Sequence, residues 1–403
     1  MSLEWLPSGG VTAAQGFVAG ATYAGIKTAG EGKLDVALLH SEAPCAVAAV
    51  FTRSKIASPP VRYSRSVVRH GRVQAAVANS GCANAATGAQ GRRDAREMAR
   101  LAGARLGLAA DQVLVASTGV IGHLMPMDKL ATGIKQTTPT HDGGSAFARA
   151  IITTDTVPKE AALSLVLGRR RVVLGGAVKG AGMIHPDLAT FLGFLTTDAA
   201  VEPATLQSAL RRAADVSFNM LTVDGDTSPN DTLVLFANGR AGNAPVRADT
   251  PEGAAFQQAL DALCIHLAKA MARDAEGAHH LLEVTVEGAA NEAQARRAAK
   301  TIAGSPLVKT AVHGADPNWG RVLAALGRSG ARLREDRVEL YLGEMCLFRQ
   351  GRPQPFDEKA ASRLMAQPEV TFLVRLDLGP GRATAYGCDL SAEYVSINSD
   401  YTT

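Results

Sequence analysis

The pattern of apolar and polar residues predicts short strands that alternate with helices along the whole chain. Segment 281–287 reads Leu-Leu-Glu-Val-Thr-Val-Glu, an alternation typical of a strand with one buried face. Apolar runs predict further strands at 36–39, 46–51, 73–78, 113–116, 232–237, 338–342, 371–378 and 382–386. Apolar residues at helical spacing predict helices at 92–106, 143–152, 203–218, 256–272 and 293–302. The pattern therefore predicts a mixed α/β protein, with antiparallel pairing in its last third.

Composition and charge exclude several classes of function. The chain has 403 residues, enough for two or three domain-sized units or one large two-lobed unit. Of these residues 46% are hydrophobic and 20% charged, as in an ordinary globular protein. The formal net charge of +4 is mild, and the basic residues form no dense block along the sequence. Aromatic residues make up 5%, too few for an evident platform on which bases could stack. Because phosphate-backbone binding needs clustered cations, we expect no nucleic-acid partner.

The cysteines and the hydropathy indicate the compartment. The five cysteines are odd in number, lie far apart and include no Cys-x-x-Cys pair, which argues against a disulfide framework. Residues 1–11 lack the basic and apolar regions of a signal peptide, and no apolar stretch approaches the roughly 20 residues of a membrane span. We therefore expect a cytoplasmic protein that has no membrane partner.

Thr190 is the strongest candidate for a nucleophile. It lies in segment 179–198, Lys-Gly-Ala-Gly-Met-Ile-His-Pro-Asp-Leu-Ala-Thr-Phe-Leu-Gly-Phe-Leu-Thr-Thr-Asp. A threonine hydroxyl needs a base beside it, and a chain cut before the threonine frees an α-amine that can serve as that base. The small Ala189 and the glycine-rich approach suit a backbone strained for an N→O acyl shift. The alternative is an ordinary β-branched residue at the start of a strand.

Two blocks of this segment resemble a known family. Gly-Met-Ile-x-Pro-x-x-Ala-Thr and Leu-Thr-Thr-Asp-Ala are similar to the self-cleaving acetyltransferases of arginine biosynthesis, the glutamate N-acetyltransferase or ornithine acetyltransferase family. Segments 79–88 and 316–321 are also family-like, so the resemblance runs from Gly16 to Thr403. The chain departs from the family's more usual Ala, Asn and Met at three positions, His185, Asp187 and Leu188. These departures bear on the rate of cleavage rather than on cleavage itself.

The resemblance implies a fold and a processed chain. The implied fold is a layered αββα sandwich of the self-cleaving N-terminal-nucleophile type, in two lobes. Cleavage between Ala189 and Thr190 would give an α chain, 1–189, with the oxyanion-hole and substrate loops. The β chain, 190–403, would begin with the nucleophile and end in a tail that closes the site. The implied assembly is α2β2.

The resemblance also implies a reaction. Acetyl passes from N2-acetylornithine to L-glutamate by a ping-pong mechanism through an acetyl-Thr190 ester, without a metal or other cofactor. In bifunctional members acetyl-CoA serves as a second donor, which would allow this chain to make N-acetylglutamate from acetyl-CoA.

Thr118 and Gly119 are candidates for the oxyanion hole. They follow the predicted strand 113–116, and a helix is predicted soon after, at 127–135. Backbone N–H groups and a hydroxyl at the edge of a sheet suit the binding of a developing negative charge. An ordinary strand-to-helix turn explains the same residues. The resemblance assigns the Thr118 hydroxyl and the Gly119 N–H to the oxyanion hole.

A further set of side chains binds substrate if the resemblance holds. The set comprises Thr154, with Thr153 as second choice, Lys179, Glu276, Asn398 and Thr403, together with Thr190. Lys179 would meet the α-carboxylate of an amino acid, and Glu276 would pair with a cationic amine such as that of ornithine. Without the resemblance these positions suggest a helix cap, a solvated lysine, a charged helix end and a frayed tail.

Motifs for phosphate and metal binding are incomplete. Segment 175–182 is rich in glycine, which predicts a loop, but it lacks the Gly-Lys-Ser/Thr ending of a phosphate loop. Segment 224–231 begins like a calcium loop, yet Pro229 and Leu235 occupy positions that require Gly and Glu. A turn held by bonds from side chains to the backbone is the better interpretation. The histidines lack the His-Glu-x-x-His spacing of a zinc protease.

Two rival functions remain open. An N-terminal-nucleophile aminopeptidase or amidase would cut itself in the same way but pass its acyl group to water. A non-catalytic amino-acid-binding or regulatory protein would remain a single uncut chain. The identity of the acyl acceptor separates the first rival from an acetyltransferase, and the chain mass separates the second.

Overall fold

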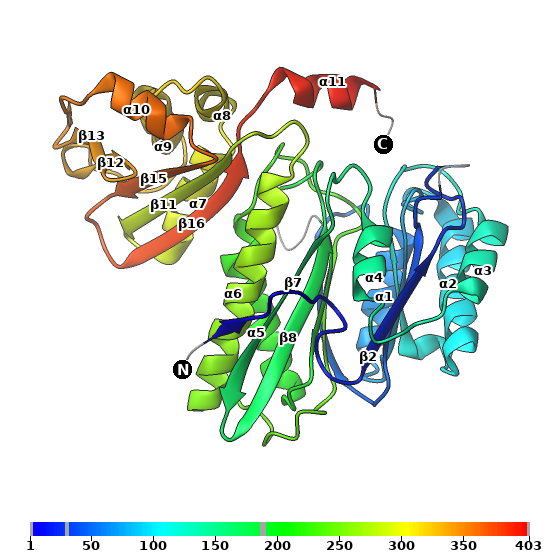
Figure 1. Cartoon of the computed structure of the whole chain (residues 1–403). Coiled ribbons are helices and arrows are strands. Elements are labelled where there is room, and N and C mark those ends of the chain that lie inside the picture. The colour runs from blue at the N-terminus through cyan, green and yellow to red at the C-terminus, as the bar shows by residue number, and fades with distance from the viewer. Residues whose placement is uncertain (1–2, 29–31, 186–190, 401–403) are drawn as a thin grey trace.

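The computed structural model describes residues 3–28, 32–185 and 191–400, and the chain folds into two lobes (Figure 1). The first lobe contains two sheets and the second lobe one. The larger sheet of the first lobe has the order β1-β7-β8-β9-β10-β4. Its strands are β1 (Glu4–Trp5), β7 (Lys159–Leu167), β8 (Arg170–Lys179), β9 (Leu192–Thr197), β10 (Thr232–Ala237) and β4 (Ala46–Phe51). Its neighbours are antiparallel except for the parallel pair β9 and β10.

The smaller sheet of the first lobe packs face to face on the larger one. Its order is β2-β3-β5-β6, from β2 (Phe17–Thr22), β3 (Val36–Ser41), β5 (Ala75–Asn79) and β6 (Val113–Ser117). Apolar residues from the facing sides of both sheets form one buried cluster. In this cluster the rings of Phe147 and Phe194 meet edge to face, with centroids 5.0 Å apart. Helix α4 (Gly144–Ile151) supplies Phe147 and packs against both sheets.

Helices cover the outer faces of both sheets. Helices α5 (Pro203–Val216) and α6 (Pro251–Arg273) pack on the larger sheet, and α2 (Gly88–Leu106) and α3 (Met127–Gln136) pack on the smaller one. Helix α1 (Pro59–Val68) lies against β6 and β4. The order helix, sheet, sheet, helix is visible from left to right in the lower part of Figure 1. The predicted αββα sandwich is thereby confirmed.

The second lobe is a mixed sheet with helices packed on it. Its order is β14-β13-β12-β15-β11-β16, with β11 and β15 parallel and the other pairs antiparallel. The strands are β11 (Leu281–Ala289), β12 (Glu339–Leu342), β13 (Met345–Arg349), β14 (Arg352–Pro353), β15 (Glu369–Arg375) and β16 (Gly381–Cys388). The helices are α7 (Glu292–Ala303), α8 (Pro306–His313), α9 (Trp319–Gly327) and α10 (Glu358–Met365). Helix α7 packs on β11 and β16.

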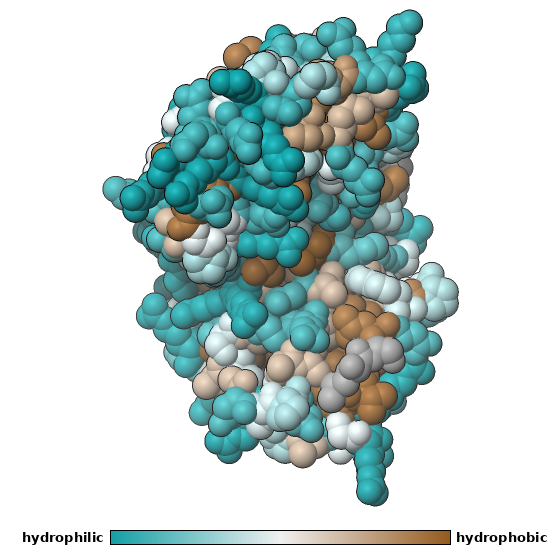
Figure 2. Space-filling view, turned by 90° about the vertical axis from the view of Figure 1, so that its left-hand side faces the viewer, coloured by the Kyte–Doolittle hydropathy of each residue, from teal (hydrophilic) through white to brown (hydrophobic). Residues whose placement is uncertain are grey.

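The chain returns to the first lobe at its C-terminal end. After β16 the last helix, α11 (Ala392–Asp400), leaves the second lobe and extends above the first lobe (Figure 1). On the face shown in Figure 2, polar side chains predominate, and hydrophobic side chains gather in a hollow between the upper and lower parts and on the lower part.

The prediction of a loop at 175–182 was wrong for its first half, because β8 continues to Lys179. A Cβ atom on Gly175 would lie 2.1 Å from the backbone oxygen of Gly10, and one on Gly176 would lie 2.5 Å from a methyl group of Leu195. These glycines therefore allow close packing on both faces of a central strand rather than a turn.

The structure bears on two predictions, one about disulfides and one about membrane spans. The five cysteines, all within the described residues, are free, as expected of a chain without a disulfide framework. In the described ranges, no helix has both the length and the apolar character that crossing a membrane requires.

Candidate active site

Strand ends and loops of the two sheets, the segment after α6 and the tail helix α11 enclose a cavity of about 240 Å³. Thr118 follows β6, Lys179 ends β8, and Leu192 begins β9, so three strand ends meet there. Glu276 lies just after α6, and Asn398 comes from α11. The fold thus collects Thr118, Gly119, Thr154, Lys179, Glu276 and Asn398, residues far apart in sequence, on one cavity.

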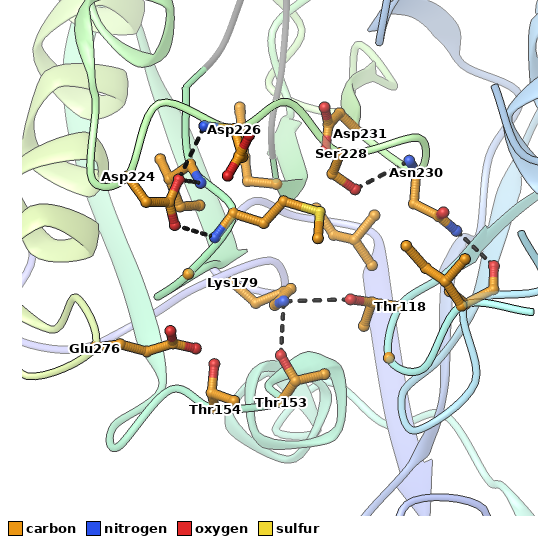
Figure 3. A pocket seen from close by; sticks show the side chains of 18 of the residues that line it. Thr118, Thr153, Thr154, Lys179, Asp224, Asp226, Ser228, Asn230, Asp231 and Glu276 are labelled. Carbon is orange, nitrogen blue, oxygen red and sulfur yellow. Dashed lines mark hydrogen bonds between the residues drawn. The ribbon is translucent and has the colours of Figure 1, made fainter. Parts of the chain in front are cut away.

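Lys179 is buried at the centre of this group (Figure 3). Its Nζ donates hydrogen bonds to Thr153 Oγ1 at 2.8 Å and to Thr118 Oγ1 at 3.2 Å. Burial lowers the pKa of Lys179 below its ordinary value, against the opposing effect of the Asp155 carboxylate. With 8% of its surface exposed, Lys179 is not the solvated lysine of the alternative interpretation.

A buried ion cluster that the sequence did not reveal holds Lys179 in place. Asp155 Oδ1 accepts hydrogen bonds from Lys159 Nζ at 2.6 Å and from the N–H of Gly180 at 2.7 Å. Its Oδ2 accepts one from the N–H of Thr153 at 3.1 Å. Burial opposes ionisation of Asp155, but Lys179 and Lys159 outweigh it and lower the pKa of Asp155. The carboxylate therefore fixes the segments on both sides of the Lys179 ammonium.

Gly119 lies in a tight backbone crossing beside Thr118. Its φ of +126° suits only glycine, and a Cβ there would lie 2.4 Å from the carbonyl carbon of Gly81. The N–H of Thr118 donates to the oxygen of Asn79 at 3.0 Å, while the N–H of Gly119 has no hydrogen-bond partner among the described residues. The turn thus presents one hydroxyl and one unpaired N–H at the cavity wall.

The side chains of Glu276 and Asn398 meet across the cavity mouth. Asn398 Nδ2 donates to Glu276 Oε2 at 2.8 Å, which ties the tail helix to the end of α6. A Cβ on Gly182 would lie 2.4 Å from the Glu276 carboxylate, so glycine at this position leaves room for the acid. In Figure 3 the hydroxyl of Thr154 lies beside Glu276 and below Lys179. The cavity therefore combines an ammonium, a carboxylate and hydroxyls.

The loop 224–231 forms the opposite wall, and sequence reasoning missed its place in the site. Asp224 accepts hydrogen bonds from the N–H groups of Met183 at 2.5 Å and Ile184 at 2.9 Å. Asn230 Nδ2 donates to the oxygen of Ser117 at 2.8 Å. Within the loop, the N–H of Asp226 donates to Asp224 Oδ1 at 3.1 Å and the N–H of Asn230 donates to Ser228 Oγ at 3.2 Å, which confirms the predicted turn held by bonds from side chains to the backbone.

Asp231 is the most perturbed acid of this wall. It is almost fully buried, and burial raises its pKa well above the ordinary value, although Ser228, Lys179 and Thr52 oppose the shift. Its Oδ2 finds no hydrogen-bond partner among the described residues. Nothing in the local sequence distinguishes this acid from Asp224 and Asp226 of the same loop.

Three predicted site residues lie outside the described residues, namely Ala189, Thr190 and Thr403. The described residues nearest to the predicted cleavage position on each side are His185 and Phe191. Phe191 lines the cavity, as does Ile184, the residue before His185. Both flanks of the predicted cleavage segment therefore lie at or beside the cavity that collects the other candidates.

Known proteins resemble this chain over nearly all of its length. The chain matches the ArgJ family over residues 18–403. The "Arginine biosynthesis bifunctional protein ArgJ" of Symbiobacterium thermophilum is 53% identical over 403 residues, which cover 100% of both chains. The crystal structure of the protein of that name from Bacillus halodurans is 43% identical, with a TM-score of 0.50, and the match covers 51% of this chain and 97% of that chain.

A crystal structure of an ornithine acetyltransferase from Mycobacterium tuberculosis, complexed with ornithine, is 40% identical. Its TM-score is 0.43, over 47% of this chain and 100% of that chain. The family model and the full-length relative decide the assignment, and they confirm the resemblance seen in the residues. The chain belongs to the ArgJ family and is an acyltransferase.

Proposed function

We propose that this enzyme transfers an acetyl group from N2-acetylornithine to L-glutamate, with Thr190 as the nucleophile. The observation that carries the proposal is the single cavity lined by Thr118, Gly119, Lys179 and Glu276. Phe191, the residue bonded to Thr190, lines the same cavity. A nucleophile, an oxyanion site and groups of both charges are the parts that acyl transfer between amino acids requires.

Autocatalytic cleavage between Ala189 and Thr190 precedes the reaction in this proposal. It gives an α chain, 1–189, and a β chain, 190–403, that stay together, as α2β2 in the assembled enzyme. The solved Bacillus halodurans chain supports this division, because 97% of it is matched by 51% of the present chain. A chain of about half length in a relative of this identity is what processing near the middle would give.

The acetyl transfer then has two balanced halves. The Thr190 oxygen bonds to the acetyl carbon, the C–N bond of N2-acetylornithine breaks, and the hydroxyl proton reaches the leaving nitrogen through the Thr190 α-amine. The nitrogen of glutamate next bonds to the acetyl carbon, the ester C–O bond breaks, and a proton returns to the Thr190 oxygen. The Thr118 hydroxyl and the Gly119 N–H hold the oxyanion in both halves.

The charged groups of the cavity suit amino acids as substrates. The Lys179 ammonium would meet an α-carboxylate, and Glu276 would meet the side-chain amine of ornithine. Thr154, Asn398 and Thr403 would complete the site, with Asn398 held by its hydrogen bond to Glu276. The proposal needs no metal or prosthetic group, and acetyl-CoA is proposed as a second donor.

Intact mass and N-terminal sequencing of the purified protein test the proposal. Two chains, beginning at residues 1 and 190, are expected from the wild type, and a single inactive chain is expected from Thr190→Ala. Thr190→Ser is the matched control, because it keeps a hydroxyl and should still cut. A cut and active Thr190→Ala protein would contradict the proposed nucleophile.

An acceptor assay separates transfer from hydrolysis. N-acetylglutamate should form from N2-acetylornithine only when glutamate is present. Free acetate formed at the same rate with and without glutamate would instead indicate an amidase.

A further inference from the structure

Three histidines surround one buried aspartate at the base of the tail helix. His279 and His280 directly precede β11, His313 ends α8, and Asp389 directly follows β16. The side chain of Asp389 is fully buried, whereas those of His279 and His313 are 52% and 41% exposed. We call these four residues the histidine cluster. Among the described residues that line the active-site cavity, none belongs to this cluster.

The two carboxylate oxygens of Asp389 have different surroundings. Its Oδ1 accepts hydrogen bonds from the backbone N–H groups of His279 at 2.8 Å and His280 at 2.9 Å. Its Oδ2 instead faces three imidazole rings, with Nδ1 of His313 at 2.8 Å, of His280 at 3.4 Å and of His279 at 3.6 Å. Burial opposes ionisation of Asp389, but the hydrogen bonds from the backbone and from the His313 ring outweigh it and lower its pKa. An anionic oxygen therefore lies among three nitrogens that are all able to bind a metal ion.

Hydrogen bonds leave this arrangement incomplete. The ring of His313 is close enough to donate to Asp389 Oδ2, but the buried Nδ1 of His280 has no hydrogen-bond partner among the described residues. An ion that takes the lone pair of His313 Nδ1 would end the hydrogen bond from that ring. Asp389 Oδ2 could then accept a hydrogen bond from the Nδ1–H of His280. A bound ion thus gives every nitrogen that faces Asp389 a partner, which matters because a buried polar atom without one is unfavourable.

The spacing of the cluster matches that of ligands around one ion. A tetrahedral zinc ion lies about 2.0–2.2 Å from its nitrogen and oxygen ligands, so neighbouring ligand atoms are about 3.4 Å apart. One ligand atom from each of His279, His313 and Asp389 can be chosen so that all three lie within 4.8 Å of one another. Two imidazoles and a carboxylate suit Zn²⁺ and related transition metals, whereas Mg²⁺ and Ca²⁺ prefer oxygen ligands alone.

A second carboxylate supports one of the exposed histidines. Oε2 of Glu393, in the first turn of α11, lies 3.9 Å from Nε2 of His279. When Nδ1 of His279 binds an ion, its Nε2 carries the proton and faces this carboxylate. Histidines that bind metals are commonly oriented by a carboxylate in this way. The start of α11 is therefore linked to the proposed ligand.

The cluster joins the two segments whose side chains meet at the mouth of the active-site cavity. One segment runs from Glu276 to the histidines before β11, and the other runs from Asp389 into α11 (Figure 1). The segments also contact one another directly, because Ser391 Oγ donates to the backbone oxygen of Gly277 at 2.7 Å. An ion bound to both segments would hold α11 in place, and with it the hydrogen bond from Asn398 to Glu276.

We propose that His279, His313 and Asp389 bind one divalent transition-metal ion of the Zn²⁺ type, and that this ion fastens the base of the tail helix. Water completes the coordination on the exposed side, and Glu393 orients His279. The ion has a structural role and takes no part in the proposed acetyl transfer. The metal site therefore stands or falls independently of the proposed function.

Calorimetry with ZnCl₂ on the mature wild-type enzyme, after treatment with a chelator, tests the site. One Zn²⁺ should bind per polypeptide pair, and MgCl₂ should produce no binding signal. The double substitution His279→Gln/His313→Gln should weaken zinc binding more than about 100-fold, because loss of a supporting residue alone costs about 10–100-fold. The matched control is His70→Gln/His141→Gln, which changes two exposed histidines outside the cluster. Each single substitution in the cluster keeps the test open if the double variant fails to fold.

Limited proteolysis tests whether the ion fastens the tail. Chymotrypsin cleavage after Tyr394, in α11, is followed by mass spectrometry with and without zinc. Zinc should slow this cleavage in the wild type and in the His70→Gln/His141→Gln control, and should not slow it in His279→Gln/His313→Gln. Zinc that does not bind the wild type, or binds it no better than the cluster variant, overturns the site. Zinc that binds at the cluster but leaves cleavage after Tyr394 unchanged overturns its role in the tail.

Discussion

The ammonium of Lys179 lies 3.2 Å from the hydroxyl of Thr118, although 61 residues separate them in sequence. Lys179 ends a strand of the larger sheet, and Thr118 follows a strand of the smaller sheet. The hydrogen bond therefore joins the two sheets at the cavity. It also places a positive charge beside the hydroxyl that we propose for the oxyanion hole.

Replacing Lys179 by Met should separate activity from stability. Loss of the charge beside Thr118 is expected to lower kcat/KM about 100-fold or more, as the loss of an oxyanion-hole donor does elsewhere. Burial disfavours the ammonium of Lys179, which partly offsets the loss of its charge beside Asp155, so Lys179→Met should stay folded near neutral pH and lose less stability than Lys159→Met. Steady-state kinetics and urea unfolding measure the two effects. If Lys179→Met were inactive because it is unfolded, the role of Lys179 would not be limited to the active site.

Sequence reasoning located the candidates that carry a motif and missed those that tertiary packing creates. Thr118, Lys179 and Glu276 stand in recognisable runs, and the fold brings them to one cavity. Asp155 and Asp231 look like ordinary turn residues, and only burial by distant segments perturbs them. No local pattern reports a contact between segments far apart along the chain.

The strands likewise include some that the sequence predicts and others that only the packing reveals. Strands with clear apolar runs, such as β4 and β10, have the predicted bounds. Strand β8 was missed because Gly175 and Gly176 suggested a loop, whereas they permit close packing.

Replacing Glu276 by Gln should weaken substrate binding more than catalysis. If its carboxylate meets the side-chain amine of ornithine, KM for N2-acetylornithine should rise about tenfold or more, because a hydrogen bond to a charged group is lost. The KM for glutamate, which lacks that amine, should change less. Glu344→Gln is the control, since Glu344 is exposed on the turn between β12 and β13. Equal effects on both substrates would contradict this role.

Replacing Asp231 by Asn should remove a pH-dependent loss of stability. The raised pKa means that the folded state keeps a proton that the unfolded state has released. The stability of the wild type should therefore fall as pH rises from about 4 through the raised pKa. Asp231→Asn, which is neutral throughout, should lose less stability over this window.

Urea unfolding at several pH values between about 4 and 8 tests this prediction. The unfolding free energy of the wild type minus that of Asp231→Asn should decrease as pH rises. Asp226→Asn, in an exposed part of the same loop, is the control and should show no comparable trend. If the difference between the two unfolding free energies does not change with pH, Asp231 titrates alike in the folded and unfolded states.

Replacing Lys159 by Met should leave two acids unpaired, because Lys159 forms ion pairs with both Asp155 and Asp274. Removing one partner of a buried ion pair costs about 3–5 kcal/mol, since the remaining charge is left without compensation. Lys159 helps to lower the pKa of Asp155, so this stabilisation is present above the ordinary pKa of an aspartate and is lost as pH falls through the lowered one.

The deficit of Lys159→Met should therefore be largest near neutral pH and shrink in acid, as measured by urea unfolding. Lys135→Met, at an exposed position at the end of α3, controls for the loss of a lysine. The double variant Asp155→Asn/Lys159→Met should recover part of the stability, because it removes one of the uncompensated charges together with the cation. If the double variant were as unstable as the sum of its single substitutions, the two residues would not be coupled. In that case the ion cluster of Asp155 and Lys159 would not be what positions Thr153 and Lys179.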